Sequence, residues 1–289
     1  MFNNFTVLKK SININGNLLE FDCPIVMGIL NITPDSFFSD SRNSTFATAI
    51  LQAEKIIDEG ATIIDVGGQS TSPTSKMLTA DEELERITPV IKEIRGNFPQ
   101  SIISVDTFYS KVAQVAIEEL GANIINDVSG GQIDDKMFET IAHLNVPYIL
   151  MHMRGTPQTM QQLTRYDNFI RDIIFYLSEK VAVLNQLGVN DIIIDPGFGF
   201  SKTIDQNYKL MANLKYFDIF ELPLLVGVSR KTMIHKLLNT TPTESLNGTT
   251  ALNMYSLQAG ANILRVHDVK QAVECVKIYD EIIKNRDSD

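Results

Sequence analysis

Residues 224–231 read Leu-Leu-Val-Gly-Val-Ser-Arg-Lys, and residues 261–267 read Ala-Asn-Ile-Leu-Arg-Val-His. Both stretches are short apolar runs that pass directly into basic side chains. Parallel β/α barrels place their chemistry at the carboxyl ends of their strands, often with an anion site near the last two. The two stretches therefore predict a parallel barrel, and they indicate the end of it at which the functional residues lie.

The same pattern recurs in six earlier apolar runs. Nearly continuous hydrophobicity is typical of strands that are covered on both faces. The residues between the runs carry helical periodicity, most clearly over 46–59, 81–94, 168–187 and 269–283. Alternation of about eight strands and helices predicts a single (β/α)8 barrel. The expected strands are Ile25–Leu30, Thr62–Ile64, Ile102–Val105, Asn123–Ile125, Tyr148–Met151, Ile192–Ile194, Leu224–Val228 and Ile263–Leu264.

Residues 5–21 precede the first strand and read as a β-hairpin around the turn dipeptide Asn15-Gly16, with Val7 and Leu8 before the turn. We expect residues 1–22 to cover the barrel floor and residues 23–289 to form the barrel, within one domain overall. An open doubly wound sheet is the alternative. The first strand–helix unit lacks the Gly-x-Gly-x-x-Gly turn of dinucleotide-binding sheets, which favours the barrel.

Composition excludes several classes of function. The chain has 289 residues and a formal net charge of −10, which argues against a general nucleic-acid binder. It has no apolar run long enough to cross a bilayer and no basic segment followed by an apolar one, so we expect no membrane association and a cytoplasmic location. Cys23 and Cys275 are not in metal-ligand spacing, and inert thiols are favoured over a disulfide.

Carboxylates and amides end several of the expected strands. Asp106, Asn126 and Asp195 each follow an apolar run. Each of them alone could equally cap the next helix. Together at one barrel mouth, they favour a site that accepts hydrogen bonds from amidine-like N–H groups and stabilises a developing cation. Asn31 ends the first strand, where it either bonds its own turn or offers Mg²⁺ a neutral oxygen.

The last two strands end in Ser229-Arg230-Lys231 and in Arg265 and His267. Arginine recognises phosphate at two points and lysine acts as a point charge, so these residues predict an anion site. Solvated cations are the alternative reading. A lysine at a helix start opposes the helix dipole, which favours a ligand-binding role for Lys231. Met153 and Phe200 could line a flat heterocycle, although core filling explains a methionine equally well.

Taken together, these strings resemble the dihydropteroate synthase family. The resemblance implies a (β/α)8 barrel, usually a homodimer, that joins 6-hydroxymethyl-7,8-dihydropterin pyrophosphate to p-aminobenzoate and releases pyrophosphate. The matching stretches occur in family order and span almost the whole chain: residues 27–37, 65–73, 104–107, 126–131, 151–155, 195–203, 227–231 and 260–268.

The resemblance also implies a role for each matching residue. Asn31 is expected to contact Mg²⁺ and pyrophosphate, and Arg265 and His267 are expected to anchor the pyrophosphate. The expected catalytic residues are Asp35, Asp106, Asp195 and Lys231. The expected substrate-binding residues are Thr71, Asp106, Asn126, Met153, Asp195, Phe200, Ser229, Lys231, Arg265 and His267, with Ser229 on the p-aminobenzoate side. Loss of pyrophosphate leaves a delocalised cation on the pterin, which predicts dissociative substitution.

One loop departs from the family pattern. The family usually reads Gly-Gly-Glu-Ser-Thr-Arg-Pro-Gly, whereas residues 67–74 read Gly-Gly-Gln-Ser-Thr-Ser-Pro-Thr. Ser72 replaces an arginine expected to pair with Asp35 and to help order the p-aminobenzoate site. Two other functions therefore stay open. One is a pterin-binding paralogue that is non-catalytic or altered in specificity, and the other is a pterin-dependent methyltransferase barrel that serves a corrinoid protein.

Overall fold

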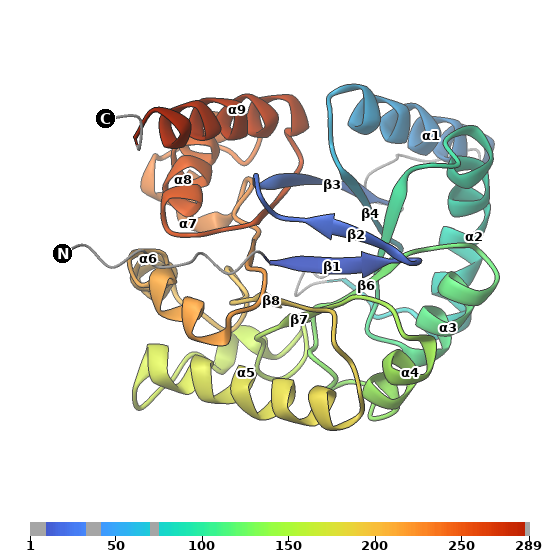
Figure 1. Cartoon of the computed structure of the whole chain (residues 1–289), viewed down its shortest axis with the longest axis horizontal. Coiled ribbons are helices and arrows are strands. Elements are labelled where there is room, and N and C mark those ends of the chain that lie inside the picture. The colour runs from blue at the N-terminus through green and yellow to red at the C-terminus, as the bar shows by residue number, and fades with distance from the viewer. Residues whose placement is uncertain (1–9, 33–41, 70–74, 287–289) are drawn as a thin grey trace.

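The computed structural model describes residues 10–32, 42–69 and 75–286, and these ranges form a (β/α)8 barrel (Figure 1). Eight parallel strands are hydrogen-bonded in the order β8-β7-β6-β5-β4-β3-β10-β9. A parallel bridge between Ile194 and Leu224 joins the two end strands and closes the ring. The predicted fold class is confirmed, and the doubly wound alternative is excluded.

Strands and helices alternate around the ring, and the helices form its outer layer (Figure 1). The barrel strands are β3 Ile25–Asn31, β4 Ile63–Gly67, β5 Ile102–Asp106, β6 Ile124–Asp127, β7 Tyr148–Met151, β8 Ile192–Asp195, β9 Leu225–Val226 and β10 Ile263–Val266. The helices are α1 Arg42–Asp58, α2 Ala80–Asn97, α3 Ser110–Glu118, α4 Met137–Leu144, α5 Phe169–Gln186, α6 Ile204–Ala212, α7 Thr232–Leu237, α8 Leu246–Gln258 and α9 Val269–Arg286, with short 3₁₀ helices η2 Met160–Gln162 and η3 Leu214–Phe220.

Several strands include the polar residue that follows the apolar run in the sequence. Asn31 belongs to β3, Asp106 to β5 and Asp195 to β8. Successive side chains of a strand point to opposite faces. Outward side chains such as Leu30 and Val105 pack against the helices in the main core. The polar neighbours of these residues therefore point into the barrel.

The N-terminal hairpin packs against the amino ends of the barrel strands. Strands β1 Ser11–Ile14 and β2 Asn17–Glu20 flank the turn at Asn15 and Gly16, whose φ values are 50° and 87°. Positive φ at both central residues is the geometry that an Asn-Gly hairpin turn requires. Figure 1 shows the hairpin lying across the ring. Val7 and Leu8 fall outside the described residues.

The contact between the hairpin and the barrel is mainly apolar, and it includes a hydrogen bond from the Asn13 N–H to Asp191 Oδ1 at 2.8 Å. Ile12, Ile14 and Phe21 are buried in one cluster with inward side chains from seven strands. These are Met27, Ile63, Ile124, Ile149, Ile193, Leu225 and Ile263. This end of the barrel is therefore filled, and a ligand site has to lie at the other end.

Two further sequence observations concern helices and thiols. No helix within the described ranges is long and apolar enough to cross a membrane. Cys23 is exposed and Cys275 is buried, and both are free thiols.

Candidate active site

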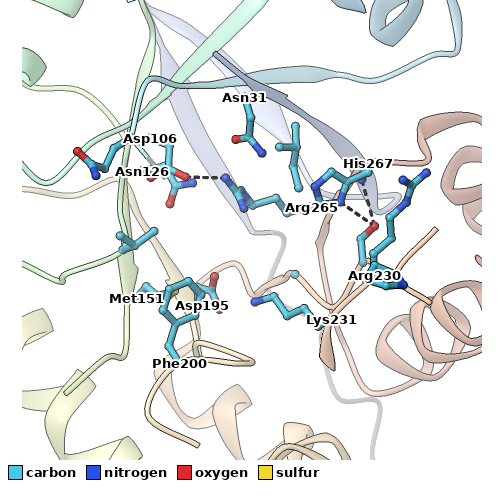
Figure 2. A pocket seen from close by; sticks show the side chains of 16 residues that line it. Asn31, Asp106, Asn126, Met151, Asp195, Phe200, Arg230, Lys231, Arg265 and His267 are labelled. Atoms are coloured by element: carbon cyan, nitrogen blue, oxygen red, sulfur yellow. Dashed lines mark hydrogen bonds and ion pairs between the residues drawn. The ribbon is translucent and has the colours of Figure 1, made fainter. Parts of the chain in front are cut away.

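A cavity of about 450 Å³ opens at the carboxyl ends of the barrel strands (Figure 2). It gathers side chains from residues that lie more than 200 positions apart in the chain. Nine of the predicted site residues line it: Asn31, Asp106, Asn126, Asp195, Phe200, Ser229, Lys231, Arg265 and His267. The barrel thus brings the predicted acids and the predicted cations to one place.

The strands reach this cavity through side chains that lie two residues apart. In β10, Ile263 belongs to the apolar floor, and Arg265 and the following His267 line the cavity. In β5, Ser104 hydrogen-bonds inside the barrel and Asp106 lines the cavity above it. The period of two that governs strands therefore sets which polar residues face the ligand.

Arg265 lies at the centre of the charged network. Its Nε donates to Asp65 Oδ2 at 2.7 Å, and its Nη2 donates to Asp106 Oδ2 at 2.6 Å and also lies 2.6 Å from Asp65 Oδ2. Figure 2 shows the guanidinium directed at Asp106 and Asn126. A buried charge is tolerated when it is paired and hydrogen-bonded. One arginine therefore balances two carboxylates inside the barrel.

Asp65 is fully buried and organises the residues around it. Besides Arg265, it accepts a hydrogen bond from Ser104 Oγ at 2.7 Å and one from Asn126 Nδ2 at 3.0 Å. Because the Asn126 amide donates through Nδ2, its Oδ1 is left as the acceptor for a ligand. Asp65 therefore sets the orientation of both Arg265 and Asn126.

Asp65 was not among the site residues predicted from the sequence. It ends an apolar run, as Asp106 and Asp195 do, so that signal was present. The strand register separates them, because Asp65 is paired with Ser104 whereas Asp106 is paired with Gly67, two residues further along. Asp65 thus lies one layer deeper than the cavity wall.

Burial dominates the electrostatics of the acids. It raises the pKa of Asp195 above the ordinary aspartate value, against the lowering effects of Lys231 and of the Gly197 N–H. It also raises the pKa of Asp106, against the lowering effect of Arg265. A cationic ligand that neutralises these carboxylates is therefore bound more favourably than a neutral one.

Lys231 lies at the start of α7, where the sequence analysis placed a ligand-binding lysine. Its Nζ donates to the carbonyl oxygen of Phe198 and lies 4.8 Å from the centre of the Phe200 ring. Burial lowers the pKa of Lys231 to about 8, although Asp195 acts in the opposite direction. The ammonium is therefore held at the cavity wall and is not a solvated charge.

His267 and Ser229 form a pair at the same end of the cavity. Ser229 Oγ accepts a hydrogen bond from the His267 backbone N–H at 3.2 Å and lies 3.1 Å from its Nδ1. Burial, together with Arg265 and Arg230, lowers the pKa of His267 to about 4. The ring is therefore neutral at pH 7 and serves as a hydrogen-bonding group, and Ser229 fixes its orientation.

The methionine prediction needs correction. Met151 lines the cavity, whereas Met153 is fully buried and does not line it, although both belong to one apolar cluster with Phe108, Val128 and Met160. Met151 is the last residue of β7 and lies two positions beyond the floor residue Ile149, which places its side chain on the inward face. Met153 follows after the strand has ended, so strand alternation no longer decides its direction.

Three further positions complete the comparison with the sequence. Thr71, Asp35 and Ser72 lie outside the described residues. Arg230 belongs to the basic run that predicts an anion site, although no individual role was expected for it; it lines the cavity, and its Nε donates to Asp268 Oδ2 at 3.0 Å. Its φ of 56° is unusual for a residue other than glycine, and no spacing in the sequence reveals it.

A second cavity of about 670 Å³ adjoins the first. The two share four lining residues, Phe200, Arg230, Lys231 and Pro242. Thr232, His235 and Lys236 of α7 line the rest of one wall. The second cavity is therefore suited to a flat molecule that carries a negative charge.

The metal prediction rests on Asn31. The described residues contain no cluster of three or more His, Cys, Asp or Glu side chains that could hold a metal ion. Asn31 lines the cavity and supplies one neutral oxygen. Mg²⁺ commonly takes few protein ligands and completes its shell with water and substrate phosphate oxygens. Asn31 therefore fits an ion that arrives with a phosphorylated ligand.

Comparison with known proteins gives a consistent result. The family described as pterin binding enzyme matches residues 27–267. The dihydropteroate synthase of Escherichia coli (strain K12) is 41% identical over 275 residues, which are 94% of this chain and 96% of that protein.

Solved structures agree with this match. The Yersinia pestis dihydropteroate synthase with a sulfonamide drug complex superposes with a TM-score of 0.88 at 37% identity, covering 96% of this chain and 100% of that chain. The Xanthomonas albilineans dihydropteroate synthase in complex with 7,8-dihydropteroate gives a TM-score of 0.84 at 32% identity, covering 94% and 98%.

Proposed function

The chain belongs to the pterin-binding enzyme family, and from that premise we propose how its residues carry out the reaction. The chain is a transferase of folate biosynthesis. It condenses 6-hydroxymethyl-7,8-dihydropterin pyrophosphate with p-aminobenzoate to give 7,8-dihydropteroate and pyrophosphate. The observation that carries the assignment of roles is that one cavity holds Asp106, Asn126 and Asp195 beside Lys231, Arg265 and His267.

The acids and the amide are assigned to the pterin ring. A pterin presents an amino-pyrimidinone edge with several N–H donors. Asp106 and Asp195 can accept from such donors, and Asn126 offers the oxygen that its bond to Asp65 leaves free. Met151 and Phe200 line the same cavity and suit the faces of a flat ring. The cavity therefore offers hydrogen-bond acceptors to the edge of the pterin ring and apolar contacts to its faces.

The cations are assigned to the diphosphate. Among the described residues, Arg265 uses Nε and Nη2 for Asp65 and Asp106, which leaves Nη1 for the ligand. Lys231 supplies a second charge and neutral His267 a hydrogen-bonding ring. As the bond to pyrophosphate lengthens, negative charge builds up on the leaving group, and these residues stabilise it.

The substitution is assigned a dissociative course. Departure of pyrophosphate leaves a delocalised cation on the pterin methylene carbon, and the carboxylates of Asp106 and Asp195 lie in the same cavity to stabilise it. The lone pair of the weakly basic arylamine then forms the new C–N bond to the methylene carbon, and the protonated amine gives its proton to the released pyrophosphate or to water. This course needs positioning of the amine and no covalent enzyme intermediate.

The second cavity is assigned to p-aminobenzoate. It meets the first at Phe200 and Lys231, so an amine held there can approach the pterin. Its wall also includes His235 and Lys236, which suit the carboxylate of the substrate. Ser229 bonds His267 and so belongs to the diphosphate side, in contrast to the role that the resemblance implied for it.

Mg²⁺ is assigned to the diphosphate as well. Asn31 is the described residue that would supply an oxygen to it. When bound, the ion would neutralise charge on the leaving group. Isothermal titration of wild type and Asn31→Ala with pyrophosphate, with and without Mg²⁺, tests this assignment. An equal Mg²⁺ dependence in the two proteins would contradict it.

The function is tested by measuring pyrophosphate release from dihydropterin pyrophosphate. We expect release to require p-aminobenzoate and to match the amount of dihydropteroate formed. Tight pterin binding with no release at any p-aminobenzoate concentration would indicate the non-catalytic paralogue instead. Transfer of a methyl group from a methylated pterin to a corrinoid acceptor would indicate the methyltransferase.

We also propose that the chain forms a homodimer through the face made by η3, α7, α8 and α9. Large apolar side chains are exposed there, with Ile219 72% and Leu237 60% exposed. Others are Tyr216, Leu238, Tyr255, Ile278 and Ile282. Exposed apolar patches of this kind mark interaction surfaces. Sedimentation of wild type and Leu237→Glu tests this, and a wild-type monomer at micromolar concentration would contradict it.

A further inference from the structure

The loop between Asp195 and Phe200 forms a wall of the active-site cavity. Both of these residues line the first cavity, and Phe200 also lines the second. The loop turns sharply, with Gly197 at φ 74° and its N–H donating to Asp195 Oδ1 at 2.7 Å. The direction of both side chains therefore depends on how this short turn is held.

Lys202 holds the turn from the side away from the first cavity. The side chain is 97% buried, with 3% of its surface exposed. Its Nζ donates to Gly197 O at 2.8 Å and to Phe200 O at 3.0 Å, and it lies 2.9 Å from His152 Nδ1. In its ammonium form this amino group has three N–H groups, one for each of these partners. Burial lowers the pKa of Lys202 well below the ordinary lysine value, although Asp195 acts in the opposite direction.

His152, which directly follows β7, completes this arrangement. The residue is fully buried, and its ring packs edge-on against Tyr176 with centroids 4.8 Å apart. Burial lowers its pKa, so the neutral ring can accept through Nδ1. Its backbone N–H donates to Asp195 O at 3.0 Å. His152 therefore joins Lys202 to the strand end that carries Asp195.

The contact between His152 and the turn leaves no room for a side chain at position 197. A Cβ atom on Gly197 would lie 2.1 Å from His152 O. On the cavity side, Lys231 donates to Phe198 O. The turn is thus held between two lysines; Lys231 lines both cavities, and Lys202 lines only the second.

We propose that Lys202, supported by His152, is a positioning residue that fixes Phe200 and Asp195 for both substrates. The inference rests on the proposed function, because it names the residue that prepares the same site. Burying an ammonium is costly, and an apolar side chain of similar length would usually be as stable. The three contacts with the turn and with His152 give this buried amino group a specific task.

The order of the turn can be measured directly because the chain contains no tryptophan. Phe200→Trp introduces a single fluorescent reporter on the turn. In that background, Lys202→Met is expected to roughly double the acrylamide quenching constant, since a loop that has lost its hydrogen bonds opens more often. Lys209→Met, at an exposed lysine of α6, is the matched control and should leave quenching unchanged.

Kinetics then separate positioning from a general structural effect. Lys202→Met without the reporter is expected to lower kcat/KM for both substrates about thirtyfold, mostly through KM, because small misplacement of binding groups is costly. His152→Leu removes one acceptor and should lower it about fivefold. His152→Asn can restore the acceptor through Oδ1 and should stay within about twofold of wild type.

A folded Lys202→Met protein with normal quenching and with kcat/KM within about twofold of wild type would overturn the inference. If Lys202→Met fails to fold, equal kinetics for His152→Leu and His152→Asn would overturn it. If wild type shows no turnover, the proposed function fails separately. Acrylamide quenching of the Phe200→Trp proteins, with 6-hydroxymethylpterin as the ligand, then still decides the role of Lys202.

Discussion

The amino and carboxyl ends of the barrel use the same inward strand positions for different tasks. At the amino end, Ile149 and Ile263 pack with the hairpin in an apolar cluster. Two residues further along the same strands, Met151 and Arg265 line the ligand cavity. A single pleat of the strand therefore separates a position that stabilises the fold from one that contacts substrate.

Two arginines show the same contrast. Arg95 donates to the carbonyl oxygens of Pro99 and Ser101 at 2.8 Å each and to that of Gly121 at 2.7 Å, close to the amino ends of β5 and β6. Arg265 donates to two carboxylates at the other end. The first arginine joins segments of backbone, whereas the second holds opposite charges beside a cavity.

The largest effect on activity is expected from Arg265→Met, and Arg95→Met is the matched comparison. Arg265→Met should lower kcat/KM by roughly 1,000-fold, about 4 kcal/mol of transition-state stabilisation, because it removes a diphosphate contact and leaves two buried carboxylates unpaired. Arg95→Met should lower the melting temperature and leave kcat/KM of the folded protein unchanged. Steady-state kinetics and thermal melting of both variants check this. An equal loss of activity in both would remove the distinction between the two ends.

The next effect concerns stability alone. Ile149→Ala should reduce the free energy of unfolding by about 2–4 kcal/mol, because it opens a cavity in the apolar floor. Its kcat/KM should stay within about twofold of wild type, since the floor lies one layer below the site. Met151→Ala is the matched variant on the same strand and should mainly raise KM for the pterin substrate. Urea unfolding and kinetics check the pair, and a catalytic defect in Ile149→Ala would contradict the separation.

Much of this arrangement could be predicted from the sequence. Short apolar runs that end in Asp106, Asp195 and Arg265 indicate both the barrel and the end that carries its chemistry. The prediction works because parallel strands of similar length deliver their last residues to one place. The turn dipeptide Asn15-Gly16 likewise indicates the hairpin, since few residues tolerate positive φ at both positions.

The missed features depend on information that a single sequence lacks. Asp65 resembles Asp106 in sequence, but the register between β4 and β5 places it one layer deeper. Met153 lies beyond the end of β7, where strand alternation no longer applies. Lys202 looks like an ordinary lysine until the fold brings His152 beside it. The depth at which a side chain lies in the barrel, and the side chains that it contacts, are set by the closed ring and not by the local sequence pattern.

A smaller effect is expected at the edge of the cavity. Lys231→Ala should lower kcat/KM at least about tenfold, equivalent to roughly 1.4 kcal/mol, because one of the diphosphate-binding charges is lost. The effect is smaller than for Arg265, because Lys231 donates to a carbonyl oxygen and not to a carboxylate. Its removal therefore does not deprive a carboxylate of a directly bonded cation. Lys236→Ala, on the same helix but lining only the second cavity, should affect mainly the KM for p-aminobenzoate. A reversed pattern would place the diphosphate elsewhere.

The smallest expected effect is a pH dependence of kcat/KM that arises only from groups at the carboxyl end of the barrel. Burial lowers the pKa of Lys231 to about 8, so its ammonium is complete below that pH and is lost as the pH rises through it. Because kcat/KM reports ionisations of the free enzyme, it should fall above pH 8 in wild type. Lys231→Met should lack this decline, since the guanidinium of Arg265, whose pKa Asp65 and Asp106 raise despite its burial, stays charged. Ile149→Ala should retain the decline, because the floor contributes no titrating group, and an identical alkaline decline in Lys231→Met would assign it to another group.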